Sequence, residues 1–187
     1  MAVQGKTDTR GRNTRREAPE AEQKQFEELV INIDRVARVV KGGRRFRFKA
    51  LVVVGDRKNK VGVGVAKGAD VQTAIAKAAD VAKKNFITIP ISNGTIPHDA
   101  EVKVSGAQVL IKPAAPGTGI IAGGVVRSII GVTGVHNLLS KSLGSTNKVN
   151  IAYATIDALK SLVPKEEWLN TPKKKTAPKK ETKEETK

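Results

Sequence analysis

The strongest constraint on the fold is a block of three apolar runs, rich in β-branched residues and separated by two short cationic turns. The runs are Leu29–Val40, Phe46–Val54 and Val61–Ala66, and the turns are Lys41–Arg44 and Asp56–Asn59. Short β-branched runs between turns that contain Gly, Asn or Asp are typical of antiparallel strands. The pattern predicts a three-stranded meander whose apolar side chains need a cover.

The spacing of the apolar residues changes after this block and predicts a helix. Asp70 is the expected N-cap, and Lys83 and Lys84 lie at the C-terminal end, where cations complement the helix dipole. One stripe of this helix holds Val71, Ile75, Ala78, Ala79 and Ala82. Residues 26–91 are therefore expected to form a β-β-β-α unit in which the helix covers the meander.

Residues 92–163 are expected to form a second unit of order β-β-β-α-β-α, which makes the whole chain an α+β protein of two small domains. Asn93-Gly94 is a hairpin signal, because both residues tolerate a positive φ. Strands are predicted at 101–104, at 108–112 and near 135–142, with a helix through Arg127 and Ile130 between the last two. Thr146 or Asn147 then caps a final helix with the stripe Val149, Ala152, Tyr153, Ile156, Leu159 and Val163.

Both ends of the chain are polar, and we expect them to be disordered basic tails. Residues 1–25 and 164–187 have no apolar pattern to bury, although a helix over Glu20–Glu28 is an alternative for part of the first tail. The N-terminus lacks the apolar run of a signal peptide. The most apolar segment, 119–135, carries Arg127 and five glycines, so it is a poor membrane span. We expect a soluble, cytoplasmic protein with no membrane partner.

The charge distribution points to a polyanionic partner. Val36–Lys60 carries nine basic residues against one acidic residue, which is half of the net charge of +16. Cations gathered on a small scaffold favour nucleic acid as the partner, whereas a solvated hairpin is the bland alternative. Phe46 and Phe48 share one strand face, and only 3% of the residues are aromatic. We therefore expect both phenylalanines in the core rather than stacked on RNA bases.

Two glycine-rich segments resemble nucleotide-binding loops only superficially. Gly117–Ala122 matches G-x-G-x-x-A, but no Asp or Glu lies between Val102 and Ile156 to hold a ribose. A glycine turn that offers backbone N–H groups to an RNA phosphate stays open. Gly62–Gly68 lacks the spacing of a P-loop, and its glycines are expected where another backbone comes close.

The remaining inventory does not support catalysis. The chain has no cysteine, and its two histidines, His98 and His136, are far apart in sequence. His98–Glu101 could hold a metal, but a hydrated loop is the favoured interpretation. No nucleophile, base and orienting group can be combined from these residues. We expect neither an enzyme nor a bound cofactor or metal.

Several sequence segments between about Phe26 and Val163 together resemble the bacterial small-subunit ribosomal protein five family, and they occur in the same order as in that family. They are Val39–Phe46, Ala50–Asp56, Val61–Gly64, Asn93–Thr95, Gly117–Gly124, Gly134–Asn137, Gly144–Asn147 and Ala154–Asp157. The resemblance implies an N-terminal domain like a double-stranded-RNA-binding fold without its first helix, and a C-terminal domain of left-handed β-α-β type. It also implies small-subunit rRNA, ribosomal proteins four and eight, and messenger RNA near the entry channel as partners, with an influence on decoding accuracy.

Charge and resemblance together define the candidate site residues. The RNA-binding candidates are Arg38, Lys41, Gly42, Gly43, Arg44, Arg45, Arg47, Arg57, Lys58, Lys60, Lys67, Lys112, Thr118, His136, Asn137, Lys141, Asn147 and Lys148. Gly117, Gly119 and Arg127 match the family's interface with ribosomal protein four. The chain departs from the family at Arg57–Asn59, where glycine is usual, and at Gly131, Lys148 and Tyr153, where an acid, a proline and an arginine are common.

Three functions follow from these observations. The leading one is a structural, decoding-related rRNA-binding protein of the small subunit. A free RNA-binding or RNA-remodelling factor would use the same first domain away from the ribosome. A phosphate-loop enzyme built on Gly117–Gly124 would have to turn over nucleotide.

Overall fold

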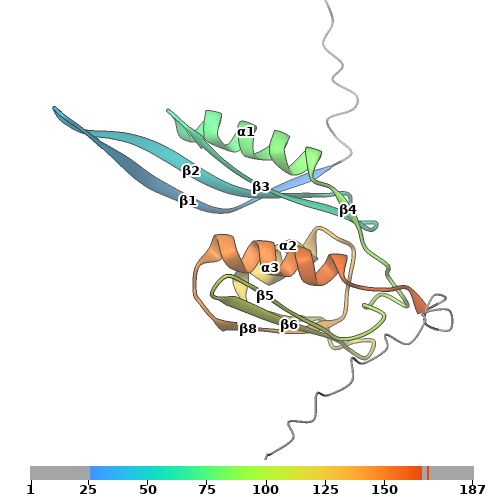
Figure 1. Cartoon of the computed structure of the whole chain (residues 1–187). Coiled ribbons are helices and arrows are strands. Elements are labelled where there is room, and N and C mark those ends of the chain that lie inside the picture. Colours follow the sequence, from blue (N-terminus) through green and yellow to red (C-terminus); the bar gives the residue numbers. More distant parts are fainter. Residues whose placement is uncertain (1–25, 166–167, 169–187) are drawn as a thin grey trace, which may run out of the picture.

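The computed structural model describes residues 26–165 and 168 and shows an α+β protein of two units that pack against each other (Figure 1). The expectations for the tails, residues 1–25 and most of 164–187, lie outside the described residues. Glu27 and Glu28 are already part of a strand, so the alternative helix does not extend to Glu28.

The first unit is the predicted antiparallel meander with its helix. Its sheet has the order β1-β2-β3-β4, and a short last strand, which the sequence did not indicate, follows the helix. The elements are β1 (Glu27–Val40), β2 (Gly43–Gly55), β3 (Lys60–Gly68), α1 (Val71–Lys84) and β4 (Ile87–Thr88). Asp70 is the N-cap of α1, as predicted, and its N–H donates to Thr73 Oγ1 at 3.3 Å.

Helix α1 packs closely on one face of this sheet because both surfaces carry small residues. Ala50, Val52 and Val54 of β2 contact the buried alanines of α1. A Cβ on Gly62 or Gly64 of β3 would lie 2.2 or 2.1 Å from a carbonyl oxygen of α1. The expected close backbone approach at these glycines is thus confirmed.

The second unit has the order β-β-β-α-β-α, but its third strand, β7, was not among the predicted strands. Its sheet has the order β5-β6-β8-β7 and is antiparallel except for the pair β7–β8, which α2 connects as a β-α-β unit. The elements are β5 (Ala100–Val104), β6 (Ala107–Pro113), β7 (Ile120–Ile121), α2 (Gly124–Gly131), β8 (Leu138–Gly144) and α3 (Lys148–Lys160). Of the two caps considered for α3, Asn147 is correct, and its side chain accepts from Val149 N at 3.1 Å.

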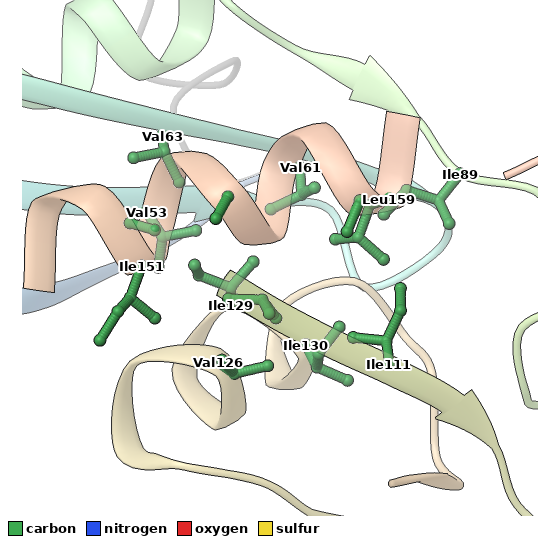
Figure 2. Close-up of a cluster of buried hydrophobic side chains, with 14 of the residues drawn as sticks. Val53, Val61, Val63, Ile89, Ile111, Val126, Ile129, Ile130, Ile151 and Leu159 are labelled. Atoms are coloured by element: carbon green, nitrogen blue, oxygen red, sulfur yellow. The ribbon is translucent and has the colours of Figure 1, made fainter. Parts of the chain in front are cut away.

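The two units share one hydrophobic core. The face of the first sheet that α1 leaves free packs on α3 and on the residues around it (Figure 2). Its buried side chains Leu51, Val53, Val61 and Val63 belong to the same cluster as Ile129, Ile130, Ile151 and Leu159 of the second unit. The first sheet is therefore buried on both faces over its central part.

Helix α3 lies between the two sheets, and this changes which of its residues are buried. Tyr153, a member of the predicted apolar stripe, is 40% exposed, whereas Ile151 and Ala154 outside that stripe are buried. A single stripe describes a helix with one covered side. The prediction was wrong for Tyr153 because the buried residues of α3 gather around Thr155, and Tyr153 lies on the opposite side of the helix.

Candidate nucleic-acid interface

The β1–β2 hairpin projects beyond the rest of the first sheet (Figure 1). Strand β3 ends at Gly68, opposite Phe48, so β1 and β2 continue alone for five residue pairs, from Val36–Arg47 to Val40–Gly43. At about 3.3 Å per residue this two-stranded extension is roughly 15 Å long. We call residues 36–47 the arm. It contains the candidate turn, in which Gly43 has a φ of +136°.

One face of the arm is cationic. Directly opposite residues of an antiparallel pair point to the same face, and the pairs here are Arg38–Arg45 and Val36–Arg47. Lys67 of β3 lies beside them, and the five residues line a groove of about 430 Å³. The structure thus brings four of the predicted RNA-binding cations together, and we call this surface the cationic face.

Asp34, which lies opposite Lys49 in the strand pair beside the cationic face, is already neutralised. Asp34 forms a 2.7 Å ion pair with Lys49 and accepts a hydrogen bond from Asn32. These hydrogen bonds, the one from Lys49 first, lower the pKa of the Asp34 carboxyl. Lys148, at the start of α3, donates to Asn32 Oδ1 at 2.8 Å, so this lysine connects the two units. The four cations of the groove are left facing solvent.

The other face of the arm carries an exposed aromatic ring, contrary to prediction. Phe48 is half-buried against α1, as expected, but Phe46 is 50% exposed. The Cζ atom of Arg35 lies 3.8 Å above the centroid of the Phe46 ring. Phe46 lies in the arm, which α1 does not cover. The sequence could not indicate that the contact of α1 with this sheet ends at Phe48. Arg35 was not among the candidates, although alternation along β1 places it on this face.

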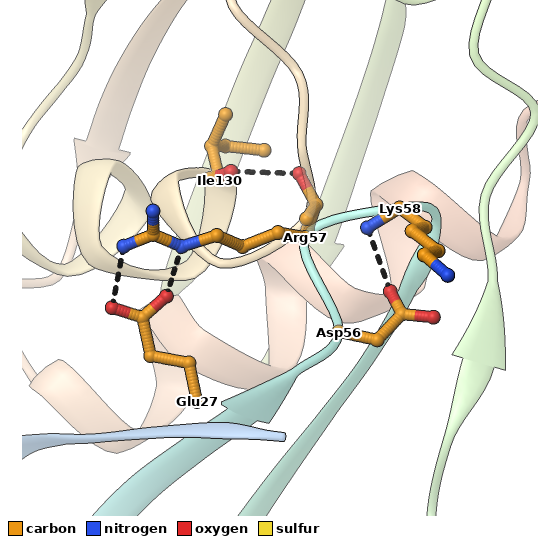
Figure 3. A network of polar contacts seen from close by, with 6 residues as sticks. Glu27, Asp56, Arg57, Lys58 and Ile130 are labelled. Carbon is orange, nitrogen blue, oxygen red and sulfur yellow. Dashed lines mark hydrogen bonds and ion pairs between the residues drawn. The ribbon is translucent and has the colours of Figure 1, made fainter. Parts of the chain in front are cut away.

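The second cationic turn lies at the opposite end of β2, about 40 Å from the tip of the arm at the usual rise per residue. Arg57 forms a bidentate pair with Glu27, which raises the pKa of Arg57 and lowers that of Glu27 through their hydrogen bonds (Figure 3). The Asp56 side chain accepts from the backbone N–H groups of Lys58, Asn59 and Lys60. Of the candidates here, Lys58 and Lys60 are exposed, whereas Arg57 is engaged within the protein.

The glycine loop of the second unit is held by Asn137. The Oδ1 atom of this residue accepts from Gly117 N at 3.1 Å and from Gly119 N at 3.0 Å, and both glycines have positive φ. These two N–H groups are therefore not free to bind a phosphate. Asn137 was expected at the RNA, but its side-chain oxygen is used inside the protein. Thr118 and His136 are exposed beside it.

The other candidates of the second unit lie in separate places. Lys112 and Lys141 are exposed on neighbouring strands, on the sheet face that points away from α3. Asn147 is the cap of α3, and Arg127 is exposed on α2. These residues do not join the cationic face, so the candidate set comprises several surfaces rather than one.

His98, a possible metal ligand in the sequence, makes its hydrogen bonds within the protein. His98 Nε2 accepts from Val163 N at 3.0 Å, and its Nδ1 lies 2.7 Å from the Asp99 carbonyl, so the histidine joins two chain segments. Within residues 26–165 and 168, no group of three or more His, Asp or Glu residues could hold a metal ion. No helix in the same part of the chain is long and apolar enough to cross a membrane.

A projecting arm with exposed cations gathered on one face is typical of the class of proteins that bind nucleic acid. Two family models narrow this class: the N-terminal domain of ribosomal protein S5 matches residues 26–90, and its C-terminal domain matches residues 102–170. The chain belongs to the ribosomal protein S5 family, whose members are structural proteins rather than enzymes. This confirms the resemblance seen in the sequence.

The curated relatives agree with this assignment. The chain is 53% identical over 137 residues to the small ribosomal subunit protein uS5 of Thermus thermophilus, and the identity is the same for the proteins of individual strains of that species. The aligned part covers 73% of this chain and 85% of each relative.

Proposed function

We propose that this protein is a structural constituent of the small ribosomal subunit that binds small-subunit rRNA, supports assembly and influences decoding accuracy at the messenger entry side. The observation that carries the proposal is the groove along the arm, which is lined by four exposed cations, while Asp34 beside it is paired with Lys49. Membership in the ribosomal protein S5 family supports the ribosome, in the cytoplasm, as the place where this surface acts.

The cationic face is suited to phosphates rather than to base edges. Arginine and lysine in an open groove bind backbone phosphates by charge, and the major groove of A-form RNA is too narrow for side chains to read. Each neutralised phosphate releases condensed counterions, which contributes roughly −0.7 to −0.9 to the log–log salt slope. With about three to five simultaneous contacts we expect a slope of roughly −2 to −5.

A second surface is proposed for a protein neighbour. Gly117 and Gly119 lie in a loop that Asn137 fixes, and Arg127 is exposed on the helix that follows β7. A loop that is fixed before binding loses little conformational entropy when a partner covers it. We assign this surface to ribosomal protein four, and we propose ribosomal protein eight and messenger RNA as further neighbours.

The decisive experiment is sedimentation of a cell lysate with detection of this protein across the gradient. Stoichiometric migration with small subunits is expected, and a large free pool would favour an RNA-remodelling factor that acts off the ribosome. Replacing Arg45 and Arg47 by alanine should lower rRNA affinity without changing the circular dichroism spectrum. Binding is measured with the full chain, because residues 26–91 alone would expose the shared core, including Leu51 and Val53. We keep 26–91 and 92–163 as the proposed domain division.

A further inference from the structure

The face of the arm opposite the cationic face combines exposed apolar groups with guanidinium groups. Phe46 is 50% exposed, and Val39, two strand positions beyond the residue paired with Phe46, is 75% exposed. Arg35 and Arg44 lie on the same face by the register of the hairpin. We call the surface of Arg35, Val39, Arg44 and Phe46 the aromatic face. Large apolar side chains without cover at the tip of a structural element indicate a binding surface.

Arg35 and Phe46 are already arranged as a stack. The guanidinium carbon lies 3.8 Å above the ring centroid, the distance of a close cation–π contact. Both residues are exposed, so the stacked pair is accessible from solvent. A flat aromatic ligand could extend this stack, because arginine and aromatic planes are the surfaces on which unpaired RNA bases lie.

The charge of the surroundings selects a nucleic acid over an uncharged apolar partner. Residues 35–49 contain seven cations and no acid, and the cationic face lies on the other side of the same two strands. A polyanion held there brings its bases within reach of the hairpin. Paired bases are inaccessible within a stacked duplex, so the ligand must be a base of a loop, bulge or single strand.

We propose that Arg35 and Phe46 form a stacking site for an unpaired rRNA base, so that the arm binds phosphates with one face and a base with the other. This inference rests on the proposed rRNA binding and extends it. Removing an aromatic side chain on which a base stacks lowers the affinity for RNA by about 5- to 100-fold. It leaves the number of phosphate contacts unchanged.

The test uses the full-length protein and in vitro transcribed small-subunit rRNA over a salt series. Phe46→Leu removes the ring, and Arg35→Lys keeps the charge but removes the planar guanidinium. Each should weaken binding by about 5-fold or more without changing the salt slope. Phe48→Leu, the same change in the same strand but under helix α1, is the matched control and should bind nearly as the wild type does. Thermal unfolding confirms that the variants are folded.

A second readout locates the base directly. Ultraviolet cross-linking followed by mass spectrometry should find a nucleotide on the peptide that contains Phe46, and the cross-link should be lost in Phe46→Leu. If both variants bind like the wild type while binding stays salt-dependent, the stacking site is refuted and rRNA binding stands. If the wild type does not bind rRNA at all, both proposals fail. In a third outcome, the variants bind rRNA normally but do not assemble into small-subunit particles that lack the wild-type protein. A protein then covers the aromatic face, and the inference is wrong.

Discussion

Gly134 lies directly against the backbone carbonyl of Arg57: a Cβ on Gly134 would be 2.2 Å from that oxygen. The contact joins the loop before β8 to the turn after β2, and Arg57 N donates to Val132 O at 3.0 Å beside it. Gly134 also has a φ of +86°, which disfavours any other residue. The two units therefore meet backbone to backbone, at a point that only glycine can occupy.

Replacing Gly134 by alanine should destabilise the whole protein. The left-handed backbone costs an alanine about 1–2 kcal/mol, and the clash with the Arg57 carbonyl adds to this by separating the two units. Gly131→Ala is the matched control, because a Cβ there meets nothing within 4 Å and helix α2 gains a better helix former. Urea unfolding monitored by circular dichroism measures both. Equal stability of the two variants would contradict this account of the contact.

Asp56 should make stability depend on pH in the acid range. Burial alone would raise its pKa, but hydrogen bonds from the N–H groups of Lys60, Lys58 and Asn59 outweigh burial, so the pKa is lowered. A lowered pKa in the folded state stabilises the protein above the unfolded value of about 3.9, and this contribution is lost as the pH falls through the folded value. Asp56→Asn should cost about 1 kcal/mol or more at pH 7. The difference from the wild type should shrink below about pH 4.

Urea unfolding of both proteins from about pH 7 to about pH 2.5 checks this prediction, because this range spans the unfolded pKa. The comparison with Asp56→Asn is needed because Glu27 and Asp34 also have lowered pKa values and contribute to the acid sensitivity of both proteins. A difference in stability that stays constant over the whole range would show that the charge of Asp56 plays no part in the turn.

The role of Asn137 can be separated from RNA binding. Asn137→Ala removes the acceptor of two backbone N–H groups, so opening of the glycine loop should become easier by about 1–2 kcal/mol. Hydrogen exchange at Gly117 and Gly119 should then accelerate roughly 5- to 30-fold. Asn137→Asp keeps an acceptor and should protect both amides. Unchanged exchange together with weaker rRNA binding would assign the side chain to RNA instead.

Arg57 should contribute less to phosphate binding than the cations of the arm. Its guanidinium is paired with Glu27, whereas Arg45 and Arg47 face the open groove. The double variant Arg45→Ala, Arg47→Ala should reduce the steepness of the log–log salt slope by about 1.5 to 2. Arg57→Ala should leave that slope nearly unchanged. Filter binding to small-subunit rRNA across a salt series measures both, and an equal reduction in the two variants would show that the Glu27 pair opens on binding.

The order of elements was readable from the sequence because local patterns determine it. The β-branched runs, the change to helical spacing after Asp70 and the Asn147 cap all appear in the structure at or near the predicted residues. Strands β4 and β7 have two residues each, and two residues are too few to show the alternation of apolar and polar residues that predicts a strand. Ile120–Ile121 becomes a strand only because it pairs with β8.

The wrong predictions concern which faces of the strands and helices are covered by other elements. The local sequence pattern carries no information about that cover. Phe46 is apolar, aromatic and correctly spaced for the core, and it is exposed because the helix above the sheet does not reach it. Tyr153 is exposed because it lies on the side of α3 opposite the buried residues around Thr155. One signal of the shared core was present: Ala50–Val54 is an unbroken apolar run, which is typical of a strand buried on both faces.

The register of this strand segment is fixed by the packing of both of its faces. Ala50, Val52 and Val54 fit the closely packed alanines of α1, while Leu51 and Val53 enter the core shared with the second unit. A shift of β2 by one residue would exchange these two sets, so Leu51 would be forced under α1 and Ala50 would leave a void on the other side. No single compensating substitution repairs two surfaces at once. We therefore expect one-residue insertions and deletions between Ala50 and Val54 to abolish folding.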